Sequence, residues 1–105
     1  MSGHPRFDEL TAVELELHAA KNADYAGGGD PLGNFKRVAA TLAQYPGLRL
    51  NDPMVVALVY AMKQVDAVLW LLSTGRDGKV EGIPQRLQDV SVYAKLATIL
   101  WEERE

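Results

Sequence analysis

Hydrophobic residues recur every three to four positions through most of the chain, which is the spacing of one face of an α-helix. This pattern predicts helices at about residues 7–24, 32–45, 53–73 and 84–103. The apolar face of the first consists of Phe7, Leu10, Val13, Leu17 and Ala20. No segment with the two-residue period of a strand appears. The sequence therefore predicts an all-α fold.

Glycine, proline and capping residues separate these segments. Three consecutive glycines at 27–29 end the first helix, because a helix interior tolerates such backbone freedom poorly. The pair Asp30-Pro31 predicts an N-cap and a first helical residue for the second helix. Asn51 or Asp52, followed by a proline, is expected to cap the third helix, and Gly75 is expected to terminate it.

Apolar residues almost surround the segment from Met54 to Ser73, which predicts a central, buried helix. The fourth predicted helix carries two apolar faces, which indicates two packing partners. One face consists of Leu87, Val90, Ala94, Ala97 and Trp101, and the other of Val92, Leu96 and Ile99. We therefore expect one domain, residues 1–105, built as a four-helix bundle and completed by oligomerisation.

Composition narrows the classes of partner. The net charge is −3, with 11 basic and 14 acidic residues, so the chain offers no overall positive field to a nucleic acid. Cysteine is absent, which excludes disulfides and thiolate metal sites. The longest apolar run, Met54 to Met62, is much shorter than the roughly 20 residues that span a bilayer. With no signal-peptide pattern at the N-terminus, we expect a cytoplasmic protein without a membrane partner.

Polar residues also form a stripe along the first predicted helix, at intervals of three or four. The stripe consists of Thr11, Glu14, His18, Lys21 and Tyr25. It is either a solvated face or one wall of a site. The stretch from Asn22 to Phe35 follows, and its glycines would let the backbone approach a ligand closely. There Tyr25 and Phe35 could stack on a base while Asn22 or Asn34 reads its edge, although a plain linker is the alternative.

Charged residues interrupt the two long helices in the same pattern, a basic residue followed three positions later by an aspartate. Lys63 and Asp66 lie within the apolar third helix, where they either pair with each other or face a polar pocket. Arg86 and Asp89 repeat the spacing on the fourth helix, with Tyr93 one turn later. Carboxylates from separate helices could hold a divalent metal. The candidate magnesium ligands are Glu14, Asp66 and Asp89, with Glu81 as a further candidate.

Several short motifs resemble the phage-associated nucleotide-modification-associated domain family, which is related to the MazG-like all-α nucleotide pyrophosphohydrolases. They are His18-x-x-Lys21-Asn22-x-Asp24-Tyr25, Asn34-Phe35, Lys63, Glu81 and Asp89-x-x-x-Tyr93-Ala94. The resemblance, from about residue 7 to 103, implies a dimeric or tetrameric helical bundle that binds magnesium and cleaves nucleoside triphosphates. For a chain encoded by a phage, the expected location is the cytoplasm of the host cell. The sequence departs from that group where Lys63 and Arg86 occupy positions of metal-binding glutamates.

Two functional hypotheses follow, with a purely structural oligomeric protein as a third. In the enzyme, Glu14, Asp66 and Asp89 hold Mg²⁺, which activates water against a nucleotide phosphate while Lys63 and Lys21 stabilise the developing charge. In the binding module, the same pocket holds a nucleotide without hydrolysing it. The expected catalytic residues are Glu14, Lys63, Asp66 and Asp89. The expected ligand-binding residues are His18, Lys21, Asn22, Asp24, Tyr25, Asn34, Arg86 and Tyr93.

Overall fold

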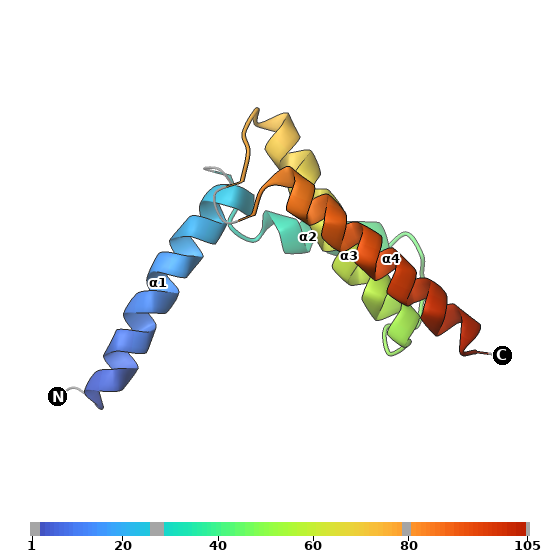
Figure 1. The fold of residues 1–105 in the computed structure, drawn as a ribbon, viewed down its shortest axis with the longest axis horizontal. Coiled ribbons are helices and arrows are strands. Elements are labelled where there is room, and N and C mark those ends of the chain that lie inside the picture. The colour runs from blue at the N-terminus through green and yellow to red at the C-terminus, as the bar shows by residue number, and fades with distance from the viewer. Residues whose placement is uncertain (1–2, 26–28, 79–80, 105) are drawn as a thin grey trace.

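The chain folds into four helices connected by turns and short loops (Figure 1). The computed structural model describes residues 3–25, 29–78 and 81–104, and only the backbone at 23–25. The helices are α1 (Pro5–Tyr25), α2 (Gly33–Leu42), α3 (Pro53–Ser73) and α4 (Ile83–Glu102). The described residues contain no strand, so the predicted all-α class is confirmed.

Both ends of α3 follow the predicted signals. Asp52 is the N-cap, and its Oδ1 accepts a hydrogen bond of 2.9 Å from the backbone N–H of Met54, with Pro53 at the first helical position. At the other end Gly75 adopts a φ of 68°, and the N–H of Arg76 donates to the carbonyl of Leu71. This is the hydrogen-bond pattern of a Schellman cap, which requires the left-handed conformation that glycine adopts freely.

The predicted N-cap of α2 and its predicted C-terminal end were wrong. Asp30 caps a tight turn and not the helix, because its Oδ1 accepts from the N–H of Leu32 and its carbonyl accepts from Gly33. The helix therefore begins two residues after Pro31. It ends at Leu42, three residues before the predicted end, where Tyr45 donates to the carbonyl of Leu42 in a tighter turn that leads into Pro46.

Helices α2 and α4 pack against α3, and these three helices form the core. Helix α4 lies antiparallel beside it, and the shorter α2 crosses its other side (Figure 1). The buried residues of α3 lie mostly in its second half, between Ala61 and Leu71, whereas on α4 only Arg86 and Ala97 are buried. The buried apolar residues of the two helices are Val55, Ala61, Ala67, Val68, Leu71 and Ala97. These residues are mostly small, so the core is thin.

Helix α1 projects away from this three-helix core, and its contacts are made mainly with α3 (Figure 1). Its apolar face, including Leu10, Val13 and Leu17, is exposed. The surface area of the chain is 7623 Å², whereas a compact monomer of this mass exposes about 5,800 Å². The radius of gyration is 16.9 Å, against about 13 Å for a compact domain of this length. A single chain thus leaves much of its apolar surface uncovered.

Helix α3 is central, as predicted, but it is not buried all round. Leu58, Val65 and Leu69 are exposed, and Leu69 keeps 60% of its surface accessible. By length and composition α3 is also apolar enough to cross a membrane, and 28% of its most apolar window is buried inside the chain.

Candidate functional site

A pocket of about 250 Å³ lies where the C-terminal end of α1, the start of α2 and the middle of α3 meet. Helix α1 and the turn before α2 form two of its walls, and Lys63 of α3 forms the third. The lining residues are His18, Lys21, Asn22, Pro31, Leu32, Asn34, Phe35 and Lys63. Six of these were proposed for the site from the sequence: His18, Lys21, Asn22, Asn34, Phe35 and Lys63.

The polar lining of this pocket is cationic or neutral. His18, Lys21 and Lys63 supply groups that carry or can gain positive charge, and no carboxylate lines the pocket among the residues described. The Oδ1 atom of Asn22 is buried and has no hydrogen-bond partner in the described part of the chain. Exposed apolar surface from Leu32 and Phe35 forms the rim. This combination suits an anionic group with an apolar or aromatic body.

Asn34 anchors the start of α2 on α3. Its Nδ2 donates to Oδ2 of Asp66 at 2.8 Å and to the backbone carbonyl of Lys63 at 3.3 Å, and the residue is only 5% exposed. Because both bonds come from the amide nitrogen, this group is already engaged within the protein. Asn34 therefore positions the pocket wall and holds Lys63 beside it.

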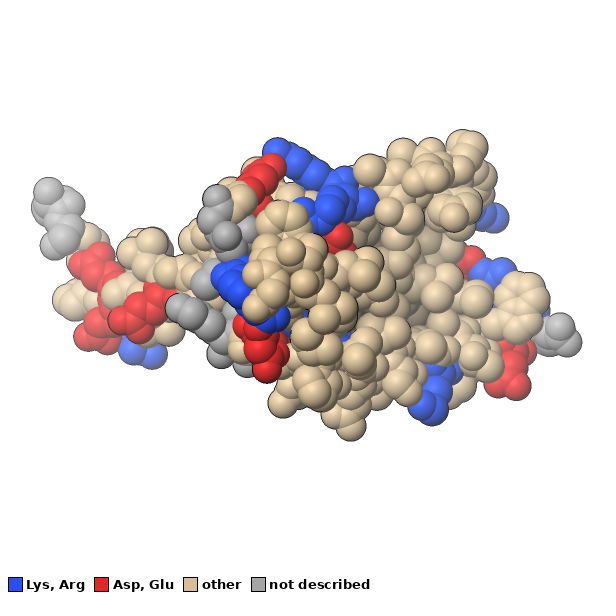
Figure 2. Space-filling view, turned by 90° about the horizontal axis from the view of Figure 1, so that it is seen from above, with Lys and Arg blue, Asp and Glu red and all other residues tan. Residues whose placement is uncertain are grey.

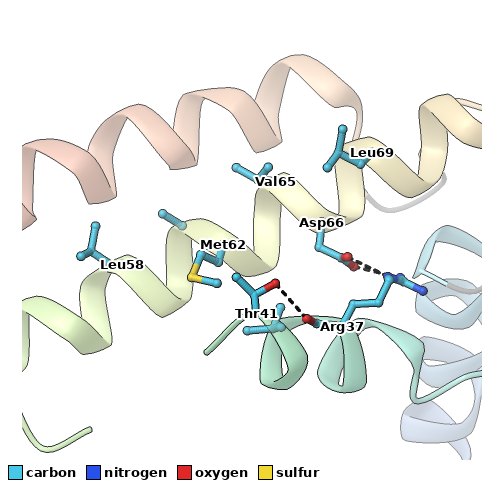
Figure 3. A pocket seen from close by; sticks show the side chains of 9 residues that line it. Arg37, Thr41, Leu58, Met62, Val65, Asp66 and Leu69 are labelled. Atoms are coloured by element: carbon cyan, nitrogen blue, oxygen red, sulfur yellow. Dashed lines mark hydrogen bonds and ion pairs between the residues drawn. The ribbon is translucent and has the colours of Figure 1, made fainter. Parts of the chain in front are cut away.

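Asp66 is paired with Arg37, a residue that the sequence analysis did not select. The Nε of Arg37 donates to Oδ1 of Asp66 at 2.7 Å and its Nη2 to Oδ2 at 2.9 Å (Figure 3). The guanidinium also lies 4.7 Å from the ring centre of Trp70, and the hydrogen bonds to Asp66 raise the pKa of Arg37. The sequence left open whether Asp66 pairs with Lys63 or faces a polar pocket, and the structure directs the carboxylate across to Arg37 on α2. The sequence signal that could have indicated Arg37 is its position three residues after Asn34, on the same face of the predicted helix.

A second polar network joins α3 to α4. Arg86 is 1% exposed, and its Nη1 donates to Oε1 of Gln64 at 2.8 Å. Gln64 in turn donates from Nε2 to Oδ2 of Asp89 at 3.2 Å, and Glu81 lies 3.8 Å from Arg86. Arg86 is not among the residues that line the pocket at α1. Sequence reasoning missed Gln64, since a lone glutamine in an apolar helix carries no distinctive pattern.

The remaining predicted residues lie at different places. Glu14 is exposed on α1, one turn before His18. Tyr93 packs edge-to-face on Tyr60 with ring centres 5.6 Å apart. The side chains of Asp24 and Tyr25 lie outside the described residues. Within the described part, no three histidine or acidic side chains are grouped as a metal site would require, and the proposed ligands Glu14, Asp66 and Asp89 belong to separate surroundings.

A second polar hollow lies at the opposite end of the core. It has a volume of about 380 Å³ and is lined by Arg49, Asn51, Asp52 and Arg104. Arg104 forms an ion pair with Asp52, the residue that caps α3. Because Asp52 compensates one of its two arginines, this hollow is a weaker anion site than the pocket at α1.

Comparisons with protein-family models, curated proteins and solved structures find no match to this chain.

Proposed function

We propose that the chain binds a phosphorylated ligand of the nucleotide class in the pocket between α1, α2 and α3. The observation that carries this proposal is the gathering of His18, Lys21 and Lys63 around one cavity whose described lining has no carboxylate. Lysine binds phosphate oxygens as a compact point charge, and a partly enclosed cavity strengthens that attraction. The amide of Asn22 adds a neutral polar group beside the cations.

The exposed aromatic ring at the rim supports a nucleotide over free phosphate. Phe35 is 68% exposed although it lines the pocket, so one face of its ring is open to a flat partner. Stacking of a base on an aromatic side chain contributes about 1–3 kcal/mol. In this arrangement the phosphates lie between the two lysines, and the base lies against Phe35 at the mouth.

The geometry supports binding more strongly than hydrolysis. Asp66 accepts three hydrogen bonds from Arg37 and Asn34, and Asp89 accepts from Gln64, so both carboxylates already have partners. Glu14 is the proposed magnesium ligand on the same helix as His18 and Lys21. We propose that Mg²⁺, where it takes part, enters with the phosphates of the ligand, since this ion is commonly held by phosphate oxygens and few protein carboxylates.

We also propose that this protein works as a cytoplasmic homo-oligomer, a dimer or tetramer, in which the bundle is completed by a further copy. The roughly 1,800 Å² of surface beyond that of a compact monomer supports this. A specific interface buries about 800 Å² per partner, and obligate homodimers bury more. The resemblance of the sequence motifs to MazG-like pyrophosphohydrolases implies a helical bundle of that kind. A MazG-like architecture is therefore part of the same proposal.

The test is thermal unfolding of the purified chain with nucleoside mono-, di- and triphosphates, in EDTA and in Mg²⁺. A ligand at 100 times its dissociation constant stabilises the folded form by about 2.7 kcal/mol. We expect stabilisation in EDTA for at least one phosphorylated nucleoside and none for the parent nucleoside. Loss of one charge-assisted contact costs about 1.5–3 kcal/mol, so Lys21→Ala should weaken binding roughly tenfold or more. Lys95→Ala, on the exposed face of α4, is the matched control.

Two results would count against the proposal. If Lys21→Ala and Lys95→Ala bind the ligand with equal affinity, the pocket is not the binding site. If neither a phosphorylated nucleoside nor inorganic pyrophosphate stabilises the chain, the proposed class of ligand is wrong. Release of pyrophosphate from a triphosphate in Mg²⁺ would instead identify the chain as a hydrolase acting on the bound ligand.

A further inference from the structure

An apolar groove of about 420 Å³ runs between α2 and α3, on a side of the core that α4 does not cover. Ala61 is among its lining residues, and one wall is a stripe on α3 with spacings of four, three and four residues (Figure 3). That stripe consists of Leu58, Met62, Val65 and Leu69. Val38 and Thr41 of α2 form the other wall, and Arg37 and Asp66 close one end. A groove with this spacing has the form that receives another helix.

Helix α1 offers a surface of matching form. Leu10, Val13 and Leu17 follow one another at intervals of three and four residues, and all three are exposed in the single chain. They extend over about 10 Å of helix, and the stripe from Leu58 to Leu69 extends over about 17 Å. The apolar face of α1 is therefore short enough to lie within the groove.

We infer that α1 of one copy docks in the α2–α3 groove of a second copy. The inference rests on the homo-oligomer proposed above and adds the surfaces that meet. The uncovered area supports a second copy as the occupant, because an excess of roughly 1,800 Å² lies in the range that obligate homodimers bury per partner. In this arrangement each chain supplies one helix and one groove, so the contact closes on itself as a reciprocal dimer.

Charge distribution favours the same occupant. Helix α1 contains five acidic and two basic residues, and its charge of −3 equals that of the whole chain. Figure 2 shows acidic side chains on the projecting helix and a largely uncharged surface over the core. Arg37, at the end of the groove, is partly exposed and lies where the acidic helix of a second copy would arrive.

A lipid bilayer is a less suitable cover for the same surface. Arg37 and Asp66 lie at the groove itself, and Lys36 is exposed on the adjacent helix. Charged side chains in hydrocarbon cost several kcal/mol each, whereas at a protein interface they can stay hydrated or paired. Lipid binding is therefore an alternative for the experiment to exclude.

This docking would couple association to the pocket. His18, Lys21 and Asn22 line the pocket from the C-terminal end of α1, and Leu10 and Val13 lie about one to three turns earlier on the same helix. A second copy that holds the N-terminal half of α1 thus also fixes one wall of the pocket. We expect Leu10→Asp to reduce both association and ligand affinity, although Leu10 does not line the pocket.

The natural chain has no cysteine, which permits a direct test. A chain carrying Leu10→Cys is mixed with a tagged chain carrying Val65→Cys, and a short bis-maleimide is added. Leu15→Cys is the matched control, because Leu15 is an exposed leucine on the opposite side of α1. The inference predicts a dimer by light scattering and cross-linking between chains from position 10 but not from position 15.

The possible failures can be told apart. A monomer at micromolar concentration would overturn both the oligomer and the docking. A dimer that cross-links from position 15 and not from position 10 would overturn the docking alone. Co-sedimentation of the wild-type chain with phosphatidylcholine vesicles, abolished by Leu69→Asp, would assign the groove to lipid and overturn the docking. Ligand binding in the thermal assay is measured independently of all three.

Discussion

Replacing Asp66 with alanine should destabilise the protein more than any other single loss on the pocket side of α3. The carboxylate accepts two bonds from Arg37 at 2.7 and 2.9 Å and one from Asn34 at 2.8 Å. These bonds join α2 to α3. The substitution leaves the buried amide of Asn34 with only its longer bond to the carbonyl of Lys63.

The cost can be worked from the exposure of each partner. Arg37 has a side chain that is 39% exposed, so water compensates much of its lost ion pair, which is then worth about 1 kcal/mol or less. Asn34 is buried, and loss of its bond to a charged acceptor costs about 1.5–3 kcal/mol. The sum is about 1.5–4 kcal/mol. For a chain of this size that corresponds to a fall in Tm of roughly 6–30 °C.

Urea denaturation followed by circular dichroism measures this loss. We expect the midpoint of Asp66→Ala to fall with an unchanged m-value, because the unfolded surface is nearly the same. Glu9→Gln is the control, since it breaks an exposed ion pair with Arg6 and should cost only a few tenths of a kcal/mol. A loss of unfolding free energy of about 0.5 kcal/mol or less for Asp66→Ala, similar to that of the control, would contradict the role of Asp66 in holding α2 on α3.

Three further predictions concern other parts of the chain. Gln64→Leu should cost about 2 kcal/mol in urea unfolding, because the Nη1 of buried Arg86 loses the amide oxygen of Gln64 at 2.8 Å; no change would contradict the buried network. Gly75→Ala should cost about 1 kcal/mol in the same assay, entirely through the backbone φ of 68°, since an added Cβ meets no atom within 4 Å. The hydrogen bond from the Lys36 ammonium, and after it the one from the N–H of Leu32, lower the pKa of Asp30 below its ordinary 3.8. The stability contributed by ionised Asp30 is therefore present above pH 3.8 and is lost as the pH falls through the lowered pKa. An NMR titration midpoint at or above 3.8 would contradict this.

The helical architecture could be predicted because its signals are local. Periodicity located all four helices, and the cap at Asp52 and the glycine at 75 fixed both ends of α3. The beginning of α2 could not be read in the same way. Asp30 can cap either a helix or a tight turn, and the choice depended on the hydrogen bonds that Leu32 and Gly33 make in the folded chain.

Tertiary partners were less predictable than helices. An apolar face on α1 indicates that something covers it, but periodicity does not say whether the cover belongs to the same chain. Likewise, the spacing of Lys63 and Asp66 fits an intrahelical pair, whereas the observed partner, Arg37, is 29 residues away in sequence. Arg86 resembles a surface residue by type, and only the packing of α4 on α3 reveals that it is buried.

The central claim, that the cationic pocket at α1 holds a phosphorylated nucleoside, is tested most directly by mapping the ligand with ¹⁵N-resolved NMR. The account predicts that amide shifts upon titration concentrate at His18, Lys21, Asn34 and Lys63, and that the parent nucleoside leaves them unchanged. Shifts concentrated instead at the hollow of Arg49 and Arg104, at the far end of the core, would contradict it.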